Sequence, residues 1–529
     1  MTGPFARRLL ALALLVGAAT DILFRGNALG VNVLVDLAIL LGAGVLAAGP
    51  ARIRRIDPLD AWLAPAALAF AAFVALRADP ALVAVDVVGA VILGGAALAS
   101  LGGRALMRAD AGRIAATAGE MALATVIGAV PVAGAVRPRQ GERTGRAAPG
   151  WAAPLLRGVL VAAPLLLVFV VLFAAADAVF AAAAGRVLAL PFDLPIAELA
   201  ERSAGVAIVA WIAAGVLVAA AGFWAVVSPP VVQVSFDPPI GTPPAGDGAE
   251  PGVAYEGGLA VVDRPGRFRI GHLEALVVLV LVDLLFAAFV ALQVAYLFGG
   301  LDTLAAAGLT YADYARRGFF ELLAAAALAA AVVATLDARV RRRSRGFAVA
   351  ALALLGLTGV TLVSSFLRLR LYQDAYGWTE LRFWVLLSIG WLAVALLAVG
   401  VLVVLGRSGR LVHVLGVLGV LGMLLANAIG PQGFVAARNL ERAMDPRLVP
   451  AGGRVGLDNA YLSTLGDDAV PAMVAALPEL AEPDRLAVRA HLEERRRELA
   501  SDPGLAGWPA WNLARAQARA ALATLDPAP

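Results

Sequence analysis

Cysteine is absent from this sequence of 529 residues. Without it the chain forms no disulfide, holds no metal through thiolates and offers no cysteine nucleophile. Histidine is almost absent as well, because only His272, His413 and His491 occur, far apart and without HExxH spacing. We therefore expect no bound metal and no other cofactor. No Walker A, GxSxG or glycine-rich dinucleotide motif occurs either, so the sequence indicates no enzyme of those classes.

Lysine is also missing, so all 43 basic side chains are arginines. The sequence pI of about 9.8 would suggest a nucleic-acid partner in a soluble protein. Here the arginines cluster in short gaps between apolar runs, which is the pattern of charges that orient a membrane protein. We therefore expect no nucleic-acid partner.

Charged residues make up only 16% of the chain, while 61% are hydrophobic. A soluble domain contains roughly 45–50% apolar residues, and many apolar runs here reach the roughly 20 residues that cross a bilayer. None alternates as a barrel strand does. The sequence predicts an all-α fold, a polytopic α-helical membrane bundle of about 11–12 transmembrane helices with a small helical soluble C-terminal domain, and a lipid bilayer as partner.

The predicted spans begin with an N-terminal run that we interpret as an uncleaved first helix rather than a signal peptide. One further run, 114–136, is ambiguous because it contains Glu120 and Pro131. The predicted spans are 8–24, 30–49, 61–77, 80–101, 156–180, 204–227, 273–297, 317–337, 346–367, 383–405 and 411–430.

The arginine distribution favours one topology. If the N-terminus is cytoplasmic and 114–136 does not cross, most arginine clusters fall inside, including "RVRRRSR" at 339–345. This favours eleven spans, with 114–136 as a re-entrant or interfacial segment, and it leaves the C-terminal domain outside the cell. Twelve spans is the alternative.

The sequence divides into three regions. Residues 1–150 would hold about four spans and the re-entrant segment, and 151–430 the remaining spans with a flexible Pro- and Gly-rich loop at 228–269. Residues 431–529 would form a soluble helical domain able to bind a protein partner. There, Asp467 or Asp468 would cap a helix with Pro471 in its first turn, and Trp508, Trp511 and Leu513 would be packing anchors. The oligomeric state is left open.

Polar residues inside apolar runs are candidates for function, because a charge at the bilayer centre is costly. One hypothesis makes the carboxylates ion- or substrate-coupling groups that face the bundle interior; the other makes them structural, bonded to a neighbouring helix. The candidate intramembrane polar site consists of Asp36, Asp86, Asp177, Asp283 and Gln293.

A second candidate is the charged stretch "LTYADYARRGFFELL" at 309–323. Read as a helix, it places Asp313, Arg317 and Glu321 one turn apart, so that they neutralise one another as the helix enters the bilayer. Tyr311 and Tyr314 suit the interface. Alternatively, Arg316, Arg317 and Glu321 form the rim of a binding site.

Several stretches resemble a bacterial family of multi-spanning membrane proteins. They are "LRGVLVAAPLLLVFVVLFAAADAVFA", "YLFGG" with the charged stretch after it, "YGWTELRFW", "AARNLERA" and "DNAYLSTLGDDAVPAMV". Together they resemble the domain of unknown function 4173 family, which is related to family 4153. The resemblance implies a bacterial inner-membrane protein with a short helical C-terminal tail, and it implies no activity.

Three functions are therefore compatible with the sequence. Helix number and intramembrane carboxylates favour a transporter or permease. The soluble tail favours a membrane scaffold or sensor whose C-terminal domain binds a partner. A membrane enzyme acting on lipid or lipid-linked sugar would rest on Asp21 and on the outer-loop acids Asp193, Glu198 and Glu201. No recognisable motif accompanies them, so an enzyme is the less favoured class.

Overall fold

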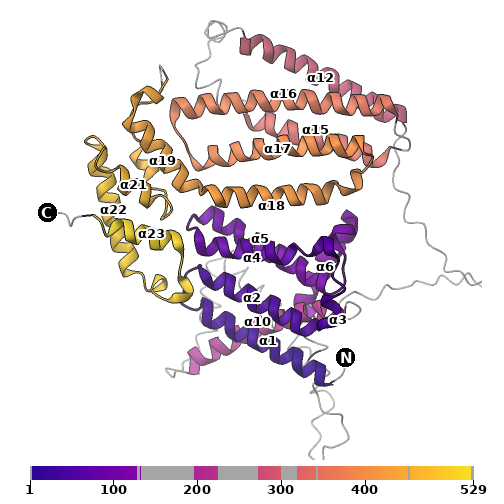
Figure 1. Cartoon of the computed structure of the whole chain (residues 1–529), viewed down its shortest axis with the longest axis vertical. Helices are drawn as coiled ribbons and strands as arrows, with labels where there is room; N and C mark the ends of the chain where they lie inside the picture. The colour runs from indigo at the N-terminus through magenta and orange to yellow at the C-terminus, as the bar shows by residue number, and fades with distance from the viewer. Residues whose placement is uncertain are drawn as a thin grey trace, which may run out of the picture.

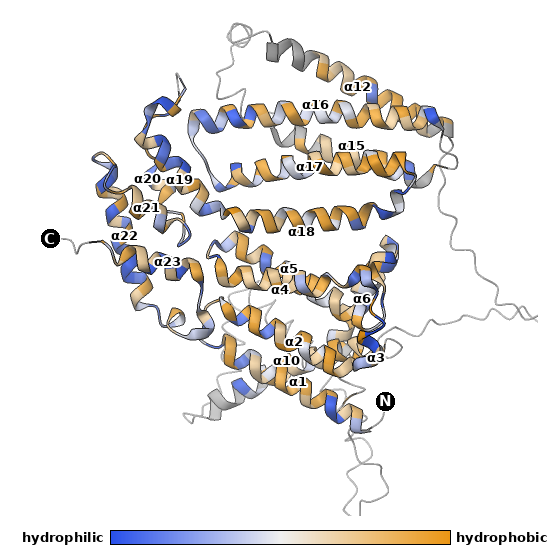
Figure 2. Cartoon of the chain, in the orientation of Figure 1, coloured by the Kyte–Doolittle hydropathy of each residue, from blue (hydrophilic) through white to orange (hydrophobic). Residues whose placement is uncertain are grey.

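The computed structural model describes residues 3–127, 132, 196–223, 272–298, 319–340, 344–450 and 453–525. Over these residues the regular elements are helices, with no β-strand among them. The predicted all-α fold is confirmed. Hydrophobic residues make up most of the long helices, whereas hydrophilic residues are concentrated at the helix ends and in the C-terminal domain (Figure 2).

The long helices form two groups (Figure 1). The first group contains six helices, which are α1 (Gly3–Phe24), α2 (Val31–Ala48), α4 (Leu63–Leu76), α5 (Pro80–Leu101), α6 (Ala111–Ile127) and α10 (Ile196–Ala220). The second group contains α12 (His272–Phe298), α15 (Phe319–Arg339), α16 (Arg345–Tyr376), α17 (Glu380–Val404) and α18 (Leu411–Ile429). Short turns of helix join them: α3 (Pro50–Ile53), η1 (Pro58–Asp60), η2 (Leu106–Arg108) and η3 (Ser408–Arg410).

Within the described residues, six helical stretches are long and apolar enough to cross a bilayer, so the chain is a multi-spanning membrane protein. They are Val31–Ala48, Pro58–Leu76, Pro80–Leu101, Arg345–Tyr376, Glu380–Val404 and Leu411–Ile429. Every predicted span except 156–180 coincides with a helix, and 156–180 lies outside the described residues. The total of eleven or twelve spans therefore stays a prediction, as does the loop at 228–269.

Helix ends follow local sequence signals. Asp79 caps α5, whose first residue is Pro80, because proline lacks an N–H and suits the first helical position. Ser344 and Thr379 cap α16 and α17 through their side chains. Gly430, at a φ of 72°, lets α18 turn directly into α19 (Pro431–Met444).

The C-terminal domain packs on one end of the bundle, which we call the domain end; the N-terminus of α1 lies at the opposite end (Figure 1). This domain contains α19, η4 (Pro446–Leu448), α20 (Asn459–Leu462), α21 (Val470–Ala476), α22 (Asp484–Ser501), η5 (Pro503–Leu505), η6 (Trp508–Ala510) and α23 (Leu513–Leu522).

The core of this domain is continuous with the bundle. Leu82 of α5, Phe383 of α17 and Ala426 of α18 belong to the same buried cluster as Met473 and Leu492. Burying apolar area contributes about 25 cal/mol per Å², so separating the domain would expose the ends of three membrane helices. The C-terminal domain and the ends of the membrane helices therefore share one hydrophobic core.

Two expectations for the domain are wrong. Neither Asp467 nor Asp468 caps α21, because Asp467 pairs with Arg495 and Asp468 bonds to the bundle. Trp508 and Trp511 are 64% and 48% exposed, so they are not packing anchors. The sequence pattern predicts where the helices of this domain lie, but it does not predict which of their faces pack against the bundle.

Helix α18 is the helix of the second group that faces the first group (Figure 1). Val420, Met423 and Leu424 on α18 pack against the core of the first group, and the His413 ring lies 3.0 Å from the Leu106 carbonyl oxygen. Within the most apolar stretch of α18, only 11% of the residues are buried inside the protein. The boundary between the groups therefore follows one thinly packed helix.

Candidate functional site

Asp36, on α2, bonds to a neighbouring helix. The Thr20 hydroxyl donates a 2.7 Å hydrogen bond to its Oδ1 atom and bonds also to the Val16 carbonyl oxygen of α1. Its partner lies on the neighbouring helix of the same group. This favours the second of the two hypotheses for Asp36.

Asp86 differs, because its partner lies across the boundary between the groups. It is fully buried on α5, and Asn427 of α18 donates a 2.7 Å hydrogen bond to its Oδ1 atom. Among the residues that the structure describes, the Asp86 Oδ2 and Asn427 Oδ1 atoms are both buried with no hydrogen-bond partner. Two acceptors are thus buried together without a donor, which is costly unless a proton or ligand supplies one.

Asp283 lies on α12, at the outer edge of the second group (Figure 1). Its neighbours Leu281, Leu284 and Leu285 are more than 60% exposed. Among the described residues its Oδ1 atom is buried without a partner. Gln293 is on the same helix, and its side chain lies outside the described residues.

The other sequence candidates are not placed. Asp177 lies outside the described residues, and so do Tyr311, Asp313, Tyr314, Arg316 and Arg317. Glu321 belongs to α15, but its side chain is not described. The charge ladder therefore stays a prediction.

A polar junction fixes the C-terminal domain to the bundle; we define it as Arg77, Asp79, Glu380, Gln432, Tyr461, Asp468 and Asn512. The Asp468 carboxylate accepts hydrogen bonds of 2.6 and 2.9 Å from the backbone N–H groups of Ala78 and Asp79. Asn512 donates bonds of 2.9 and 2.6 Å to the carbonyl oxygens of Val74 and Arg77. The domain thereby supplies partners for the backbone between α4 and α5, which those helices leave unpaired.

Arg77 connects three parts of the chain at this junction. Its guanidinium lies 3.6 Å from the Asp468 carboxylate, and it donates to the carbonyl oxygens of Asn427 and Ala428 at the C-terminal end of α18. A cation is favourable there because the helix dipole is negative at that end. Arg77 therefore holds α18 against the first group.

Asp79 and Glu380 form a carboxyl pair at the centre of the junction. Asp79 is 1% exposed, and its Oδ1 atom accepts from the N–H groups of Ala81 and Leu82. Its Oδ2 atom has no donor among the described residues, and the Glu380 carboxyl group is close enough to act on it electrostatically. Burial, and then the Glu380 charge, raise the pKa of Asp79 to about 6. One proton between the two groups would satisfy this contact.

Glu380 is held in place from the C-terminal domain. The Gln432 amide donates a 3.1 Å bond to Glu380 Oε1, and the Gln432 amide oxygen accepts from the Gly466 N–H at 2.9 Å. The Glu380 N–H donates a 2.7 Å bond to the Tyr461 hydroxyl oxygen. The position of the second carboxyl thus depends on the docking of the domain.

These groups are suited to holding protons. Among the residues that the structure describes, no group of three His, Cys, Asp or Glu side chains could hold a metal ion. Asp79 and Asp86 are seven residues apart on α5, about 10 Å along the helix axis. The site therefore consists of a carboxyl pair at the membrane surface and one buried carboxyl below it.

The sequence analysis named Asp86 as a candidate, but not Asn427, Asp79 or Glu380. The Asp79–Pro80 pair was a readable signal for a helix start. The pairing of Asp79 with Glu380 could not be predicted from the sequence, because Glu380 begins a helix about 300 residues further along the chain.

The likeness to known proteins rests on one family match. A family model with the description "Domain of unknown function (DUF4153)" matches residues 63–476. The match supports family 4153, which the sequence analysis named as the relative, and it does not show membership of family 4173. No curated protein and no solved structure matches the chain at a significant level.

Proposed function

The chain belongs to the DUF4153 family, whose description assigns no activity, and from this premise we propose that it is a proton-coupled permease. The observation that carries the proposal is the Asp86–Asn427 contact. It joins the two helix groups inside the bilayer and contains two buried oxygens for which the described part of the chain supplies no donor. Intramembrane carboxyls in such positions are typical of proton relays.

The two-group arrangement supports movement of one group against the other. Alternating access in many transporters is a rocking of two helix bundles around a site at their boundary. Here the boundary runs along α18. Protonation of Asp86 would supply the missing donor and strengthen the contact with Asn427. Loss of the proton would leave a charge in hydrocarbon and favour separation of the groups.

The carboxyl pair provides a route for the proton. Asp79 and Glu380 lie at the membrane surface on the domain end, two helical turns from Asp86. A proton taken up there would need to move about 10 Å along α5 to reach the boundary.

The proposed orientation places the domain end outside the cytoplasm of a bacterial inner membrane. Support comes from the arginine end, which we define as the end opposite the C-terminal domain; its arginines include Arg52, Arg54, Arg55, Arg345, Arg407 and Arg410. Cytoplasmic loops of membrane proteins are enriched in arginine. Because the N-terminus and the domain lie at opposite ends, the number of crossings would be odd, as in the eleven-span topology.

The test measures proton movement in vesicles that contain the purified chain and a pH-sensitive dye. A panel of amino acids, sugars and lipophilic cations is added under a pH gradient. At least one compound should accelerate proton influx several-fold in the wild type and not in Asp86→Asn. Asp36→Asn is the matched control, because that carboxyl is bonded within one group, and it should behave as the wild type. Equal fluxes in Asp86→Asn and wild type for every compound would overturn the proposal.

A second function, a scaffold that presents residues 431–529 to a partner, is favoured by the continuous core between the domain and the bundle. It predicts that Asp86→Asn leaves the biological role intact. The enzyme hypothesis is less favoured, because its main candidate residue, Asp21, forms ion pairs through both carboxylate oxygens. One is with Arg25 at 2.9 Å and the other with Arg202 at 3.1 Å.

A further inference from the structure

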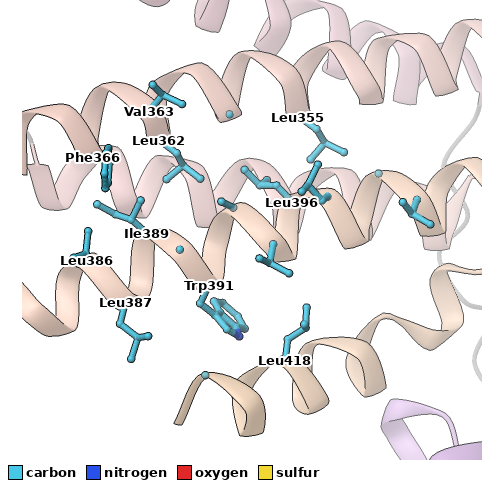
Figure 3. Close-up of a pocket in the computed structure, with 18 of the residues that line it drawn as sticks. Leu355, Leu362, Val363, Phe366, Leu386, Leu387, Ile389, Trp391, Leu396 and Leu418 are labelled. Atoms are coloured by element: carbon cyan, nitrogen blue, oxygen red, sulfur yellow. The ribbon is translucent and has the colours of Figure 1, made fainter. Parts of the chain in front are cut away.

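A long apolar groove runs along α17 in the second group. Its volume is about 1610 Å³, and its walls come from α16, α17 and α18. Phe366, Trp391, Leu396 and Leu418 point toward this space (Figure 3). None of the described residues that line it is charged. A ligand here would need to be apolar over most of its length.

Glycines leave the groove open. A Cβ atom added at Gly356 or Gly359 of α16, or at Gly390 of α17, would meet no atom within 4 Å. Leu397, which is 71% exposed, and Val404, which is 63% exposed, also line the groove. In a bilayer these walls contact acyl chains or another transmembrane segment.

Charge at one end of the groove distinguishes these occupants. The walls reach Leu352, Val404 and Leu405 at the arginine end. Arg407 and Arg410 follow directly after Leu405 in the α17–α18 turn, and both are exposed. Neither side chain makes an ion pair within the part of the chain that the structure describes. An apolar transmembrane helix in the groove would leave these two cations without a counter-charge, whereas a lipid phosphate would form ion pairs with them.

We propose that this groove binds the acyl chains of an anionic phospholipid whose phosphate lies on Arg407 and Arg410. Basic side chains next to a cleft between transmembrane helices are suited to anionic headgroups. Arginine also extends from an apolar wall toward the membrane surface. The groove thus holds the chains, and the α17–α18 turn selects the headgroup. This site is separate from Asp86 and does not depend on the proposed transport function.

The test uses Trp391 as a reporter in the full chain. The protein is reconstituted in phosphatidylcholine vesicles that contain a small fraction of brominated phosphatidylglycerol or brominated phosphatidylcholine. The quenching of Trp391 is the difference between the wild type and Trp391→Phe. Brominated phosphatidylglycerol should quench Trp391 at a lower mole fraction than brominated phosphatidylcholine does.

Two sets of variants separate the parts of the site. Replacing Arg407 and Arg410 by glutamine should weaken the preference for phosphatidylglycerol roughly fivefold per arginine, with quenching by phosphatidylcholine unchanged. Gly390→Leu should fill the groove and reduce quenching by both lipids. Gly42→Leu on α2 is its matched control, because a Cβ there also meets nothing within 4 Å.

Two results would overturn the proposal. Equal quenching by the two brominated lipids would mean that the arginines select no headgroup. No quenching of Trp391 by either lipid would mean that a protein segment fills the groove, from a second copy or from elsewhere in the chain.

Discussion

Asn512, near the end of the chain, donates a 2.9 Å hydrogen bond to the carbonyl oxygen of Val74, a residue 438 positions earlier. The same amide bonds to the Arg77 carbonyl oxygen, and the Asn512 Oδ1 atom accepts from the Arg515 N–H to cap α23. One side chain therefore completes two helix ends, the C-terminus of α4 and the N-terminus of α23. The stability of the membrane bundle and the folding of the C-terminal domain are linked through it.

Asn512→Leu should lower the free energy of unfolding by about 2–4 kcal/mol, because it removes a helix cap and leaves two buried carbonyl groups without donors. Thermal unfolding of the purified protein measures the change. Gln517→Leu, on the exposed face of the same helix, should change it little. A loss that is equal in the two variants would show that Asn512 has no special role.

Stability should rise as the pH falls from 7 to 5. Asp79 has a pKa of about 6 in the folded chain against a usual value of 3.8, so the folded state binds more protons in this window and unfolding becomes less favourable. The expected gain from this group is about 1.4 kcal/mol. It is lost again as the pH rises through 6.

Asp79→Asn should remove this pH dependence and stabilise the protein at pH 7. Asparagine still caps α5, and its amide gives the Glu380 carboxylate a donor. Asp445→Asn, an exposed helix cap outside the junction, should keep the wild-type profile. Unfolding midpoints across the pH range provide the measurement, and an unchanged slope in Asp79→Asn would contradict the shared-proton account.

The first helix group should not tolerate a side chain at Gly215 of α10. A Cβ there would lie 1.8 Å from the backbone carbonyl oxygen of Ala124 on α6, so the two helices would need to separate. Small residues at such contacts let membrane helices pack closely. Gly215→Leu should therefore sharply reduce the amount of folded protein in the membrane, whereas Gly95→Leu, which meets nothing within 4 Å, should not. Gel filtration in mild detergent distinguishes the two.

The absence of cysteine permits a direct test of the proposed orientation. Ser501→Cys, on the C-terminal domain, should react with a membrane-impermeant maleimide in intact cells. Arg55→Cys, at the arginine end, should react only after the cells are permeabilised. Both residues are exposed. The reverse pattern would place the C-terminal domain in the cytoplasm. It would therefore contradict the topology in which an odd number of crossings starts from a cytoplasmic N-terminus.

The sequence was informative where a single helix determines the outcome. Apolar length located each described transmembrane helix, and Pro431 and Gly430 mark the step from α18 into the C-terminal domain. It was not informative about partners. Asp36 and Asp86 occur in similar apolar runs, but one meets Thr20 on an adjacent helix and the other meets Asn427 of another group.

The C-terminal domain illustrates the same limit. Asp468 precedes Pro471, which is a sound signal for a helix cap, yet its carboxylate bonds to the N–H groups of Ala78 and Asp79. Two strong donors from a distant turn outcompete one local donor. Local propensity is a weak guide wherever tertiary contacts offer a better partner.

The bond between Asn512 and Val74 also sets an order for biogenesis. The ribosome releases Val74 long before it makes Asn512 and Asp468, so the turn between α4 and α5 enters the membrane without its final partners. The first helices must remain in the bilayer, with their backbone ends hydrated, until Asp468 and Asn512 have been synthesised. A nascent chain that stops short of Asn512 would keep that turn exposed and would be a natural substrate for membrane proteases.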